Sequence, residues 1–459
     1  MRIDTTTVID HPLAVVAAWH ERPGALVRLT PPGLASLEDP AQGGLEEGRH
    51  VRTALGPALL PGTVRPTWEL QHTQHSTGPE LVSFTDEQVG GPFRSWRHRH
   101  ELIAVGDRTR LVDRIALELP TALSPLSGTV RTQLERTLAY RSRQLRDDLA
   151  FHARHRDAPR LTVAVAGASG LIGTQLCALL TTGGHTVLRM VRGREAGPGE
   201  ISWDPSQGRL DPGDLQGVDA VVNLAGRSIA TRMSPQAKRE ILASRVDCAT
   251  LIARTLAAME EGPRILVQAS AIGHYGPQRP GELLTEDDPG GDGFLAGVTR
   301  AWQDAARPAE DAGVRVVHMR TGIVLSDAGG ALLPQLPLFL AGAGGRLSAP
   351  DSVLSWISLD DLVRAYAHAL LTPTLEGPVN AVAPSPATSA EFARTLGAVL
   401  HRPSLLPVPA AGPRLLLGRE GADELVLADQ RVSDQRLRAS GFEPAHPGLE
   451  AALRHVLRR

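Results

Sequence analysis

The pattern of apolar and polar residues changes character near residue 152. Residues 1–152 alternate short strand-like runs with turn residues and end in a long helical pattern from about Leu126 to Ala153. From Leu161 onward, apolar strand-like runs alternate with helical patterns, which predicts βα units in a parallel sheet. The polar segment from His152 to Arg160 is predicted to link the two regions.

A second change follows Leu371, where the Pro-rich segments TPTLEGPVNAVAPSPATS and LLPVPAAGP replace the strand and helix alternation. This change predicts a separate C-terminal subdomain over residues 372–459, after a sheet domain over residues 161–371. The predicted fold class is therefore α/β, with a doubly wound parallel sheet and a small C-terminal α/β subdomain, preceded by an α+β domain.

The segment LTVAVAGASGLIG predicts a strand over Leu161 to Ala166, a glycine turn, and a helix that opens near Leu171. Each glycine has a role in the Rossmann dinucleotide turn: Gly167 permits the tight turn, Gly170 lets the backbone approach a pyrophosphate, and Gly173 lets the helix pack on the strand. The amides at the start of this helix would face the phosphates. Ser169, Leu171 and Ile172 complete the predicted binding turn. A glycine-rich turn without a ligand is the alternative.

The next apolar run, GHTVLRMVR, ends at Arg192, where a site specific for NAD would carry an acidic residue for the ribose 2′-hydroxyl. A guanidinium group can instead contact a 2′-phosphate through several donors. The sequence therefore favours NADP(H) as the cofactor, with a surface arginine that contacts nothing as the alternative.

Two later segments add to this site. DAVVNLAG (219–226) ends in Leu224, Ala225 and Gly226, and HMRTGIVL (318–325) carries Thr321 at a predicted strand end. These segments resemble the extended short-chain dehydrogenase/reductase family, in its epimerase-like branch. WISLDDL (356–362) strengthens the resemblance, although Asp360 is equally well explained as a helix N-cap.

Further segments resemble one subgroup of atypical members, the nucleoside-diphosphate-sugar epimerase-like proteins that are sometimes labelled cell division inhibitors. They are KREILASRV, SAIGHYG, EGPVNAVAPSP, HRPSLLPVP and SGFEP, and with the segments above they span nearly all of residues 161–459. The resemblance implies an NADP(H)-binding oxidoreductase or epimerase-like enzyme that acts on a small molecule. It also implies a small C-terminal domain of unknown function.

The usual catalytic Tyr-x-x-x-Lys pair of the family is absent, because the corresponding region reads GFLAGVTRAWQDAA. In one hypothesis Ser270 orients the substrate and Tyr275 transfers the proton, with His274 as a second candidate and Arg245 or Lys238 as the cation that lowers the phenol pKa. In the other hypothesis the domain binds NADPH without chemistry and acts as a regulator or scaffold.

The N-terminal region contains FRSWRHRHEL, whose alternation places Trp96, His98, His100 and Leu102 on one strand face. Its order of strand, helix, several strands and long final helix resembles the START-like helix-grip superfamily. The resemblance implies a cavity for a hydrophobic ligand, lined by Trp68, Trp96, His98 and Leu102. His98 and His100 could also be metal ligands, but no Cys or Glu cluster joins them in the sequence, so a packed sheet face is preferred and no metal is assigned.

Composition limits the remaining possibilities. The formal net charge of -2 gives no electrostatic case for nucleic acid or an anionic membrane. Only two cysteines occur, Cys177 and Cys248, both in predicted helices, which favours a reducing, cytoplasmic compartment. No signal peptide and no membrane-spanning run is recognisable, so we expect a cytoplasmic protein without membrane or nucleic-acid partners.

Overall fold

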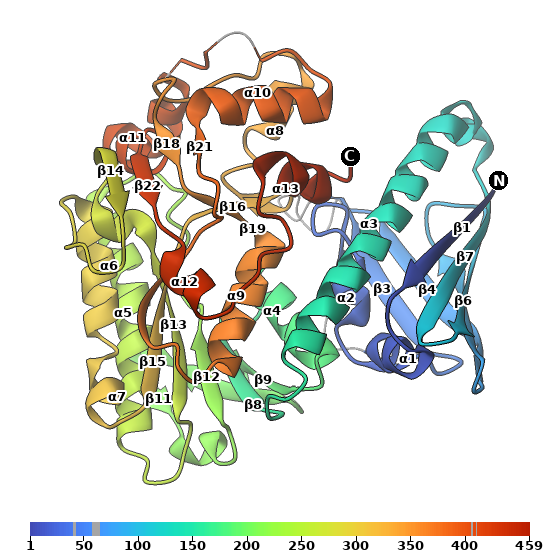
Figure 1. Ribbon diagram of the computed structural model, residues 1–459, viewed down its shortest axis with the longest axis horizontal. Coiled ribbons are helices and arrows are strands. Elements are labelled where there is room, and N and C mark those ends of the chain that lie inside the picture. Colours follow the sequence, from blue (N-terminus) through green and yellow to red (C-terminus); the bar gives the residue numbers. More distant parts are fainter. Residues whose placement is uncertain (40–42, 57–64, 405–406, 410) are drawn as a thin grey trace. The chain divides into compact units, whose positions relative to one another are not determined.

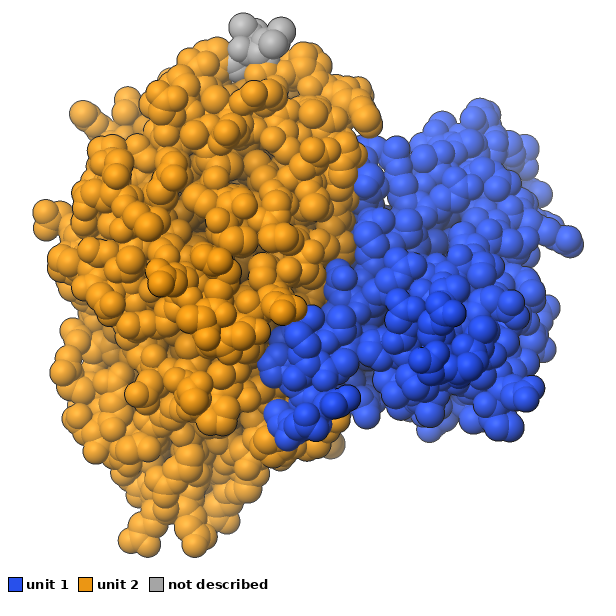
Figure 2. Space-filling model, in the orientation of Figure 1, with its two compact units in different colours: residues 1–158, 177–184, 457–459 blue, residues 159–176, 185–456 orange. Residues whose placement is uncertain are grey.

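The computed structural model describes residues 1–39, 43–56, 65–404, 407–409 and 411–459, so Leu405 and Leu406 of the HRPSLLPVP segment lie outside it. The chain forms two compact units (Figure 2). The first comprises residues 1–158, 177–184 and 457–459, and the second comprises residues 159–176 and 185–456.

The first unit is built on a seven-stranded antiparallel sheet with the order β1-β7-β6-β5-β4-β3-β2 (Figure 1). Two helices lie between β1 and β2 in the chain, and a long helix, α3, follows β7. The elements are β1 (Arg2–Ile9), α1 (Leu13–Glu21), α2 (Ala25–Leu29), β2 (Ala35–Leu37), β3 (His50–Leu55), β4 (Thr67–Thr77), β5 (Leu81–Gly90), β6 (Ser95–Val105), β7 (Arg108–Glu118) and α3 (Ser127–Arg154).

The core of this unit lies between α3 and the sheet. Leu145 and Leu149 of α3 pack in one buried cluster with Leu102 and Leu111 of the sheet, because helix residues four apart share a face. Strand β6 buries every second side chain from Trp96 to Leu102, as its alternation predicts.

Two local features of this unit differ from the sequence pattern. The long helix extends to Arg154, three residues into the predicted linker. Residues 11–29, whose apolar pattern is typical of one helix, form two helices, α1 and α2, because Pro23 lacks an amide donor and Gly24 adopts a left-handed φ of +90°.

The second unit contains an eight-stranded sheet with the order β11-β10-β9-β8-β12-β13-β15-β20. Every pair in it is parallel except β10 with β11. The strands are β8 (Thr162–Ala166), β9 (Thr186–Val191), β10 (Glu200–Asp204), β11 (Arg209–Leu210), β12 (Ala220–Asn223), β13 (Ile265–Ala271), β15 (Arg315–Thr321) and β20 (Gly377–Ala381). The strand order reverses direction at β8, so the carboxyl ends of β8 and β12 form the switch point where such sheets bind ligands.

Strand β20 shows that the sheet domain does not end at Leu371. Residues 377–381 pair in parallel with β15 and complete the sheet, although a Pro-rich segment surrounds them. The predicted boundary at 371/372 therefore cuts through the domain, because the pairing of β20 depends on a partner more than 50 residues away.

Helix α4 (Leu171–Thr182) begins in this unit, and its residues from Cys177 onward belong to the first. The other helices are α5 (Pro235–Ala257), α6 (Phe294–Asp304), α7 (Arg307–Asp311), α8 (Leu336–Leu340), α9 (Leu359–Leu371), α10 (Ser389–Leu400), α11 (Ala411–Leu425), α12 (Gln435–Ala439) and α13 (Leu449–Val456). The remaining strands are β14 (Gln278–Leu284), β16 (Ile323–Ser326), β17 (Gly329–Gly330), β18 (Val353–Leu354), β19 (Trp356–Ser358), β21 (Ala387–Thr388) and β22 (Asp429–Val432). Cys177 and Cys248 are buried in α4 and α5 and are not disulfide-bonded. Among the described residues, no helix is both long and apolar enough to cross a membrane.

Candidate active site and cofactor site

The glycine turn connects β8 directly to α4, at the switch point of the sheet. Gly167 has a φ of +79°, and a Cβ atom there would lie 2.8 Å from the carbonyl carbon of Leu224. A Cβ on Gly173 would lie only 2.2 Å from the carbonyl oxygen of Gly167. Both glycines are therefore required by the packing of the turn itself.

Gly170 differs from these two glycines. A Cβ there would meet only the carbonyl oxygen of Gly167, at 3.3 Å, and its φ is not in the left-handed region. The packing of the protein therefore tolerates a side chain at 170 better than at 167 or 173. Ser169, Gly170, Leu171 and Ile172 lie at the start of α4, where backbone amides suit a dinucleotide pyrophosphate.

Arg192 follows β9 and lines a cavity with Gly193, Asp204, Ser206 and Cys248. No hydrogen bond or ion pair of the Arg192 side chain is found in the described part of the chain. Arg194, by contrast, is engaged by Glu200 at 2.5 Å. Of these two arginines, only Arg192 keeps its guanidinium donors for a ligand.

The second loop of the cofactor site is fixed by Asn223, which sequence reasoning missed. Its buried amide oxygen accepts a hydrogen bond from the Ala225 amide at 3.1 Å, and its amide nitrogen donates to Gln268 Oε1 at 3.0 Å. These bonds set the backbone of Leu224, Ala225 and Gly226 beside the glycine turn. An asparagine at the end of an apolar strand was the only available signal.

Ser270 lies near the end of β13 and is 4% exposed. Its hydroxyl oxygen accepts a hydrogen bond of 2.6 Å from Gln303 Nε2 of α6. The hydroxyl hydrogen of Ser270 can therefore be donated to another group, such as a substrate oxygen. Gln303 was not recognised in the sequence, because its contact with Ser270 depends on how α6 packs against β13.

Tyr275 ends the short 3-10 helix η5 (Ile272–Tyr275) and is completely buried. Its hydroxyl donates to Asn380 Oδ1 at 2.8 Å and accepts from Arg320 Nη1 at 2.9 Å. Burial raises the pKa of this phenol, and the Arg320 charge opposes the increase. The cation beside Tyr275 is therefore Arg320, from β15.

The two cations that the sequence suggested for Tyr275 are used elsewhere. Arg245 donates to the carbonyl oxygens of Arg227 and Ile241, and Lys238 contacts Glu420. Both lie on α5, and the guanidinium group that contacts Tyr275 belongs to Arg320. This part of the hypothesis is wrong.

His274 is 7% exposed, and its Nδ1 atom has no hydrogen-bond partner among the described residues. Burial, together with the charges of Arg320 and Arg300, lowers the pKa of His274 to about 4. The imidazole is therefore neutral at pH 7. It lies within η5, with its ring edge-to-face against that of Tyr275.

Two further residues were considered in the sequence. Thr321 ends β15, and its hydroxyl donates to the carbonyl oxygen of Met319 at 3.3 Å. The N-cap of α9 is Ser358, whose hydroxyl accepts from the Asp361 amide at 3.0 Å. Asp360 is therefore not the cap, and its carboxylate lies 3.1 Å from His455 Nε2.

The first unit contains a separate cavity, on the sheet face that carries α3. Trp68, Trp96 and His98 line it, together with apolar residues such as Leu70 and Phe84. The prediction for Leu102 is wrong: this residue is fully buried in the core beside Leu111 and Leu145, because the strand continues beyond the cavity into packed core.

The switch-point glycine turn and the parallel sheet define a Rossmann dinucleotide-binding protein. Residues 163–322 match the NAD dependent epimerase/dehydratase family, and residues 408–456 match a domain of unknown function, DUF1731. An epimerase family protein of Mycobacterium bovis is 43% identical over 298 residues, which are 65% of this chain and 98% of that protein. The chain therefore belongs to the epimerase family.

The chain is also similar to solved structures. A nucleoside-diphosphate sugar epimerase from Corynebacterium glutamicum has a TM-score of 0.81 and 32% identity, covering 99% of this chain and 90% of that chain. Human epimerase family protein SDR39U1 (isoform 2), solved with NADPH, has a TM-score of 0.59 and 35% identity, covering 64% of this chain and 99% of that chain.

Proposed function

We propose that this protein is an NADP(H)-dependent oxidoreductase or epimerase-like enzyme that acts on a small molecule. The observation that carries the proposal is Arg192, which lines a cavity after β9 without a side-chain partner among the described residues, beside the glycine turn between β8 and α4. The human relative solved with NADPH supports the same cofactor.

In this proposal each residue has a defined task. NADP(H), when bound, supplies or accepts a hydride at a substrate carbon. Ser270 donates its hydroxyl hydrogen to the substrate oxygen, and Gln303 fixes the orientation of that hydroxyl by donating to its oxygen at 2.6 Å. Glycine amides at the start of α4 hold the pyrophosphate.

Tyr275 fits a positioning role better than the proton transfer inferred from the sequence. Both hydrogen-bonding capacities of its hydroxyl are used by Arg320 and Asn380, so proton exchange with a substrate would first have to break one of these bonds. If Tyr275→Phe abolishes turnover of a proven substrate while NADPH affinity is retained, proton transfer by Tyr275 is supported. Retained turnover assigns it to positioning.

The cofactor proposal is tested by calorimetric titration with NADPH and NADH. Arg192→Ala should weaken NADPH binding by about tenfold to a hundredfold, the range for a lost hydrogen bond to a charged group, and leave NADH binding unchanged. Arg194→Ala is the matched control, because Arg194 is held by Glu200. Equal NADPH affinity in the Arg192 and Arg194 variants would contradict the proposed 2′-phosphate contact.

A second candidate function is an NADPH-binding regulator without chemistry. It is favoured by α6, where Leu295, Val298 and Thr299 are buried at the positions around which the family places its Tyr and Lys. The discriminating measurement is NADPH consumption across a panel of carbonyl compounds and sugar nucleotides. Turnover that is lost in Ser270→Ala supports the enzyme, whereas tight binding without any consumption supports the regulator.

For the first unit we propose a START-like helix-grip domain that binds a hydrophobic small molecule. The antiparallel sheet, the two helices after β1 and the long final helix α3 support this proposal, as does the mostly apolar lining of the cavity. An apolar fluorescent dye should bind the full chain saturably. Leu26→Trp should reduce binding by filling the cavity, whereas Leu123→Trp, outside the lining, should not. Unchanged binding in Leu26→Trp would contradict this site.

A further inference from the structure

Five polar side chains meet on the sheet face of the first unit, at the wall of its cavity. We call them the histidine–aspartate cluster: His72 of β4, Asp86 of β5, His98 and His100 of β6, and Asp113 of β7. Strand register brings them together, since Asp86 is the cross-strand partner of both His72 and His98, and Asp113 that of His100. His98 and His100 are 3% and 2% exposed.

Asp113 determines the orientation of both β6 histidines. One of its oxygens, Oδ1, lies 2.9 Å from His98 Nε2 and 2.8 Å from His100 Nδ1. An ionised carboxylate only accepts hydrogen bonds, so both of these ring nitrogens carry hydrogen and donate. The other ring nitrogens, His98 Nδ1 and His100 Nε2, are therefore left to face other groups.

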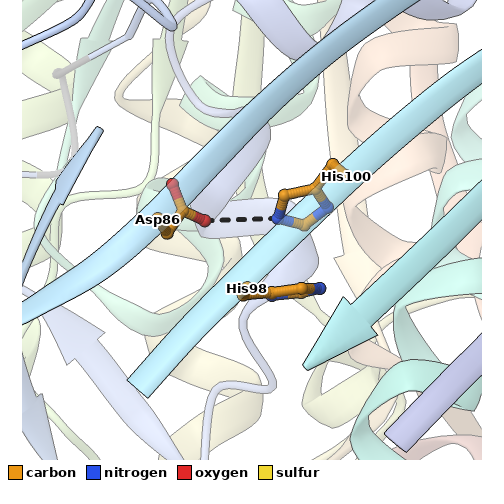
Figure 3. Close-up of side chains that lie close together, drawn as sticks. All are labelled: Asp86, His98 and His100. Carbon is orange, nitrogen blue, oxygen red and sulfur yellow. Dashed lines mark hydrogen bonds and ion pairs between the residues drawn. The ribbon is translucent and has the colours of Figure 1, made fainter. Parts of the chain in front are cut away.

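His100 Nε2 faces a second carboxylate oxygen, Oδ2 of Asp86, at 3.2 Å (Figure 3). A lone pair on this nitrogen and an acceptor oxygen repel each other unless a cation lies between them. That cation is either a proton or a metal ion. Asp86, His98 and His100 each offer a ligand atom, and these three atoms lie within 4.8 Å of one another.

We propose that Asp86, His98 and His100 bind a divalent transition-metal ion, which takes the place of the proton on His100. Two imidazole nitrogens and one carboxylate oxygen suit Zn²⁺ and similar ions, and three protein ligands leave a coordination position open. Ligand atoms around tetrahedral Zn²⁺ are about 3.4 Å apart, so side-chain rotations that close the triad by roughly an ångström complete the site.

The surroundings of the triad have the features of a metal site. Asp113 orients both histidines from behind, as carboxylates commonly do for histidine ligands. His72 Nδ1 lies 2.6 Å from the other oxygen of Asp86. Asp86 and His98 line the cavity, so the open coordination position is accessible from it.

The ion would also specify what the cavity accepts. A divalent ion neutralises the two carboxylates of Asp86 and Asp113, and Arg141, which lines the same cavity, remains as a positive group. A ligand with an anionic oxygen and an apolar body would satisfy the ion, Arg141 and the apolar walls together. The metal test below uses the ion alone, so its outcome is independent of whether an apolar ligand binds.

The experiment uses the untagged full chain, stripped of metal with a chelator and titrated with Zn²⁺ and, separately, Co²⁺. We expect saturable Zn²⁺ binding and a Co²⁺ d–d absorption band typical of four or five ligands. Asp86→Asn, His98→Gln and His100→Gln should each abolish the band, and Asp113→Asn should weaken binding by about tenfold to a hundredfold. His50→Gln is the matched control, because His50 pairs with Glu69 on the exposed side of the same sheet.

Zinc-edge X-ray absorption of the wild-type chain tests the site even where a variant does not fold. Two imidazole nitrogens at about 2.0 Å in the first shell support the site. The absence of binding, a first shell without imidazole, or variants that stay folded by circular dichroism and keep the cobalt band would each overturn the proposal.

Discussion

Among single residues, Tyr275 shows that burial can make a side chain important for stability. Its hydroxyl bridges Arg320 and Asn380 in a place without solvent. Removing a buried hydroxyl leaves its partners unsatisfied, which costs about 1–3 kcal/mol. We therefore expect Tyr275→Phe to lower the free energy of unfolding by that amount in urea denaturation while the Kd for NADPH stays unchanged. A fully neutral substitution would mean that water replaces the hydroxyl.

His274 gives a pH-dependent prediction. Its pKa is lowered to about 4 in the folded protein, first by burial and then by Arg320 and Arg300, whereas an unfolded histidine titrates near about 6.5. The unfolded state thus binds more protons between these values, so stability contributed by neutral His274 is complete above pH 6.5 and is lost as the pH falls toward 4. Melting curves of His274→Gln should lose Tm less steeply over this interval than the wild type; parallel curves would exclude His274 as a contributor.

At the scale of elements, the junction of β8 and α4 separates glycines needed for folding from a glycine needed for binding. Gly173→Ala places Cβ 2.2 Å from a backbone oxygen and must displace α4, so we expect about 1–3 kcal/mol of destabilisation and weak NADPH binding. Gly170→Ala meets the same oxygen at 3.3 Å, a much milder contact, so it should lose less Tm than Gly173→Ala while NADPH affinity falls by about tenfold or more. An equal loss of stability in the two variants would contradict this division of roles between Gly170 and Gly173.

Helices α2 and α3 are joined by a buried ion pair. Arg28 contacts Asp148 through two bonds, of 2.8 and 2.9 Å, and both side chains are 0% exposed. Removing one partner of a buried pair leaves an uncompensated charge, and Arg28→Met should destabilise the first unit by about 3–5 kcal/mol. Arg131→Met, which removes an exposed pair with Glu135 on α3, should change stability by less than about 1 kcal/mol. Urea denaturation followed by circular dichroism measures both.

At the scale of the whole molecule, the chain has two units with separate cores. We expect calorimetry to resolve two unfolding transitions. NADPH at a hundred times its Kd should stabilise the transition of the second unit by about 2.7 kcal/mol and leave the other unmoved. The stabilisation by NADPH should be smaller in the Arg192→Ala variant. A single transition that NADPH shifts as a whole would show that the units unfold together.

The local features of this protein follow from short stretches of its sequence. The spacing of Gly167, Gly170 and Gly173 specified a strand, turn and helix, because each glycine meets a local requirement of the turn. The alternation from Trp96 to Leu102 specified a strand with one buried face, because successive side chains of a strand point to opposite faces. The family resemblance could also be recognised in the sequence, because its motifs are short and contiguous.

The contacts between distant residues, by contrast, are visible only in the folded chain. Arg320 rather than Lys238 or Arg245 lies at Tyr275, Gln303 holds Ser270, β20 joins the sheet beyond residue 371, and Asp86 and Asp113 complete the cluster begun by His98 and His100. These contacts depend on strand register and helix packing between segments far apart in the chain. No local periodicity encodes them, because the free energy that fixes them comes from burial of the whole fold.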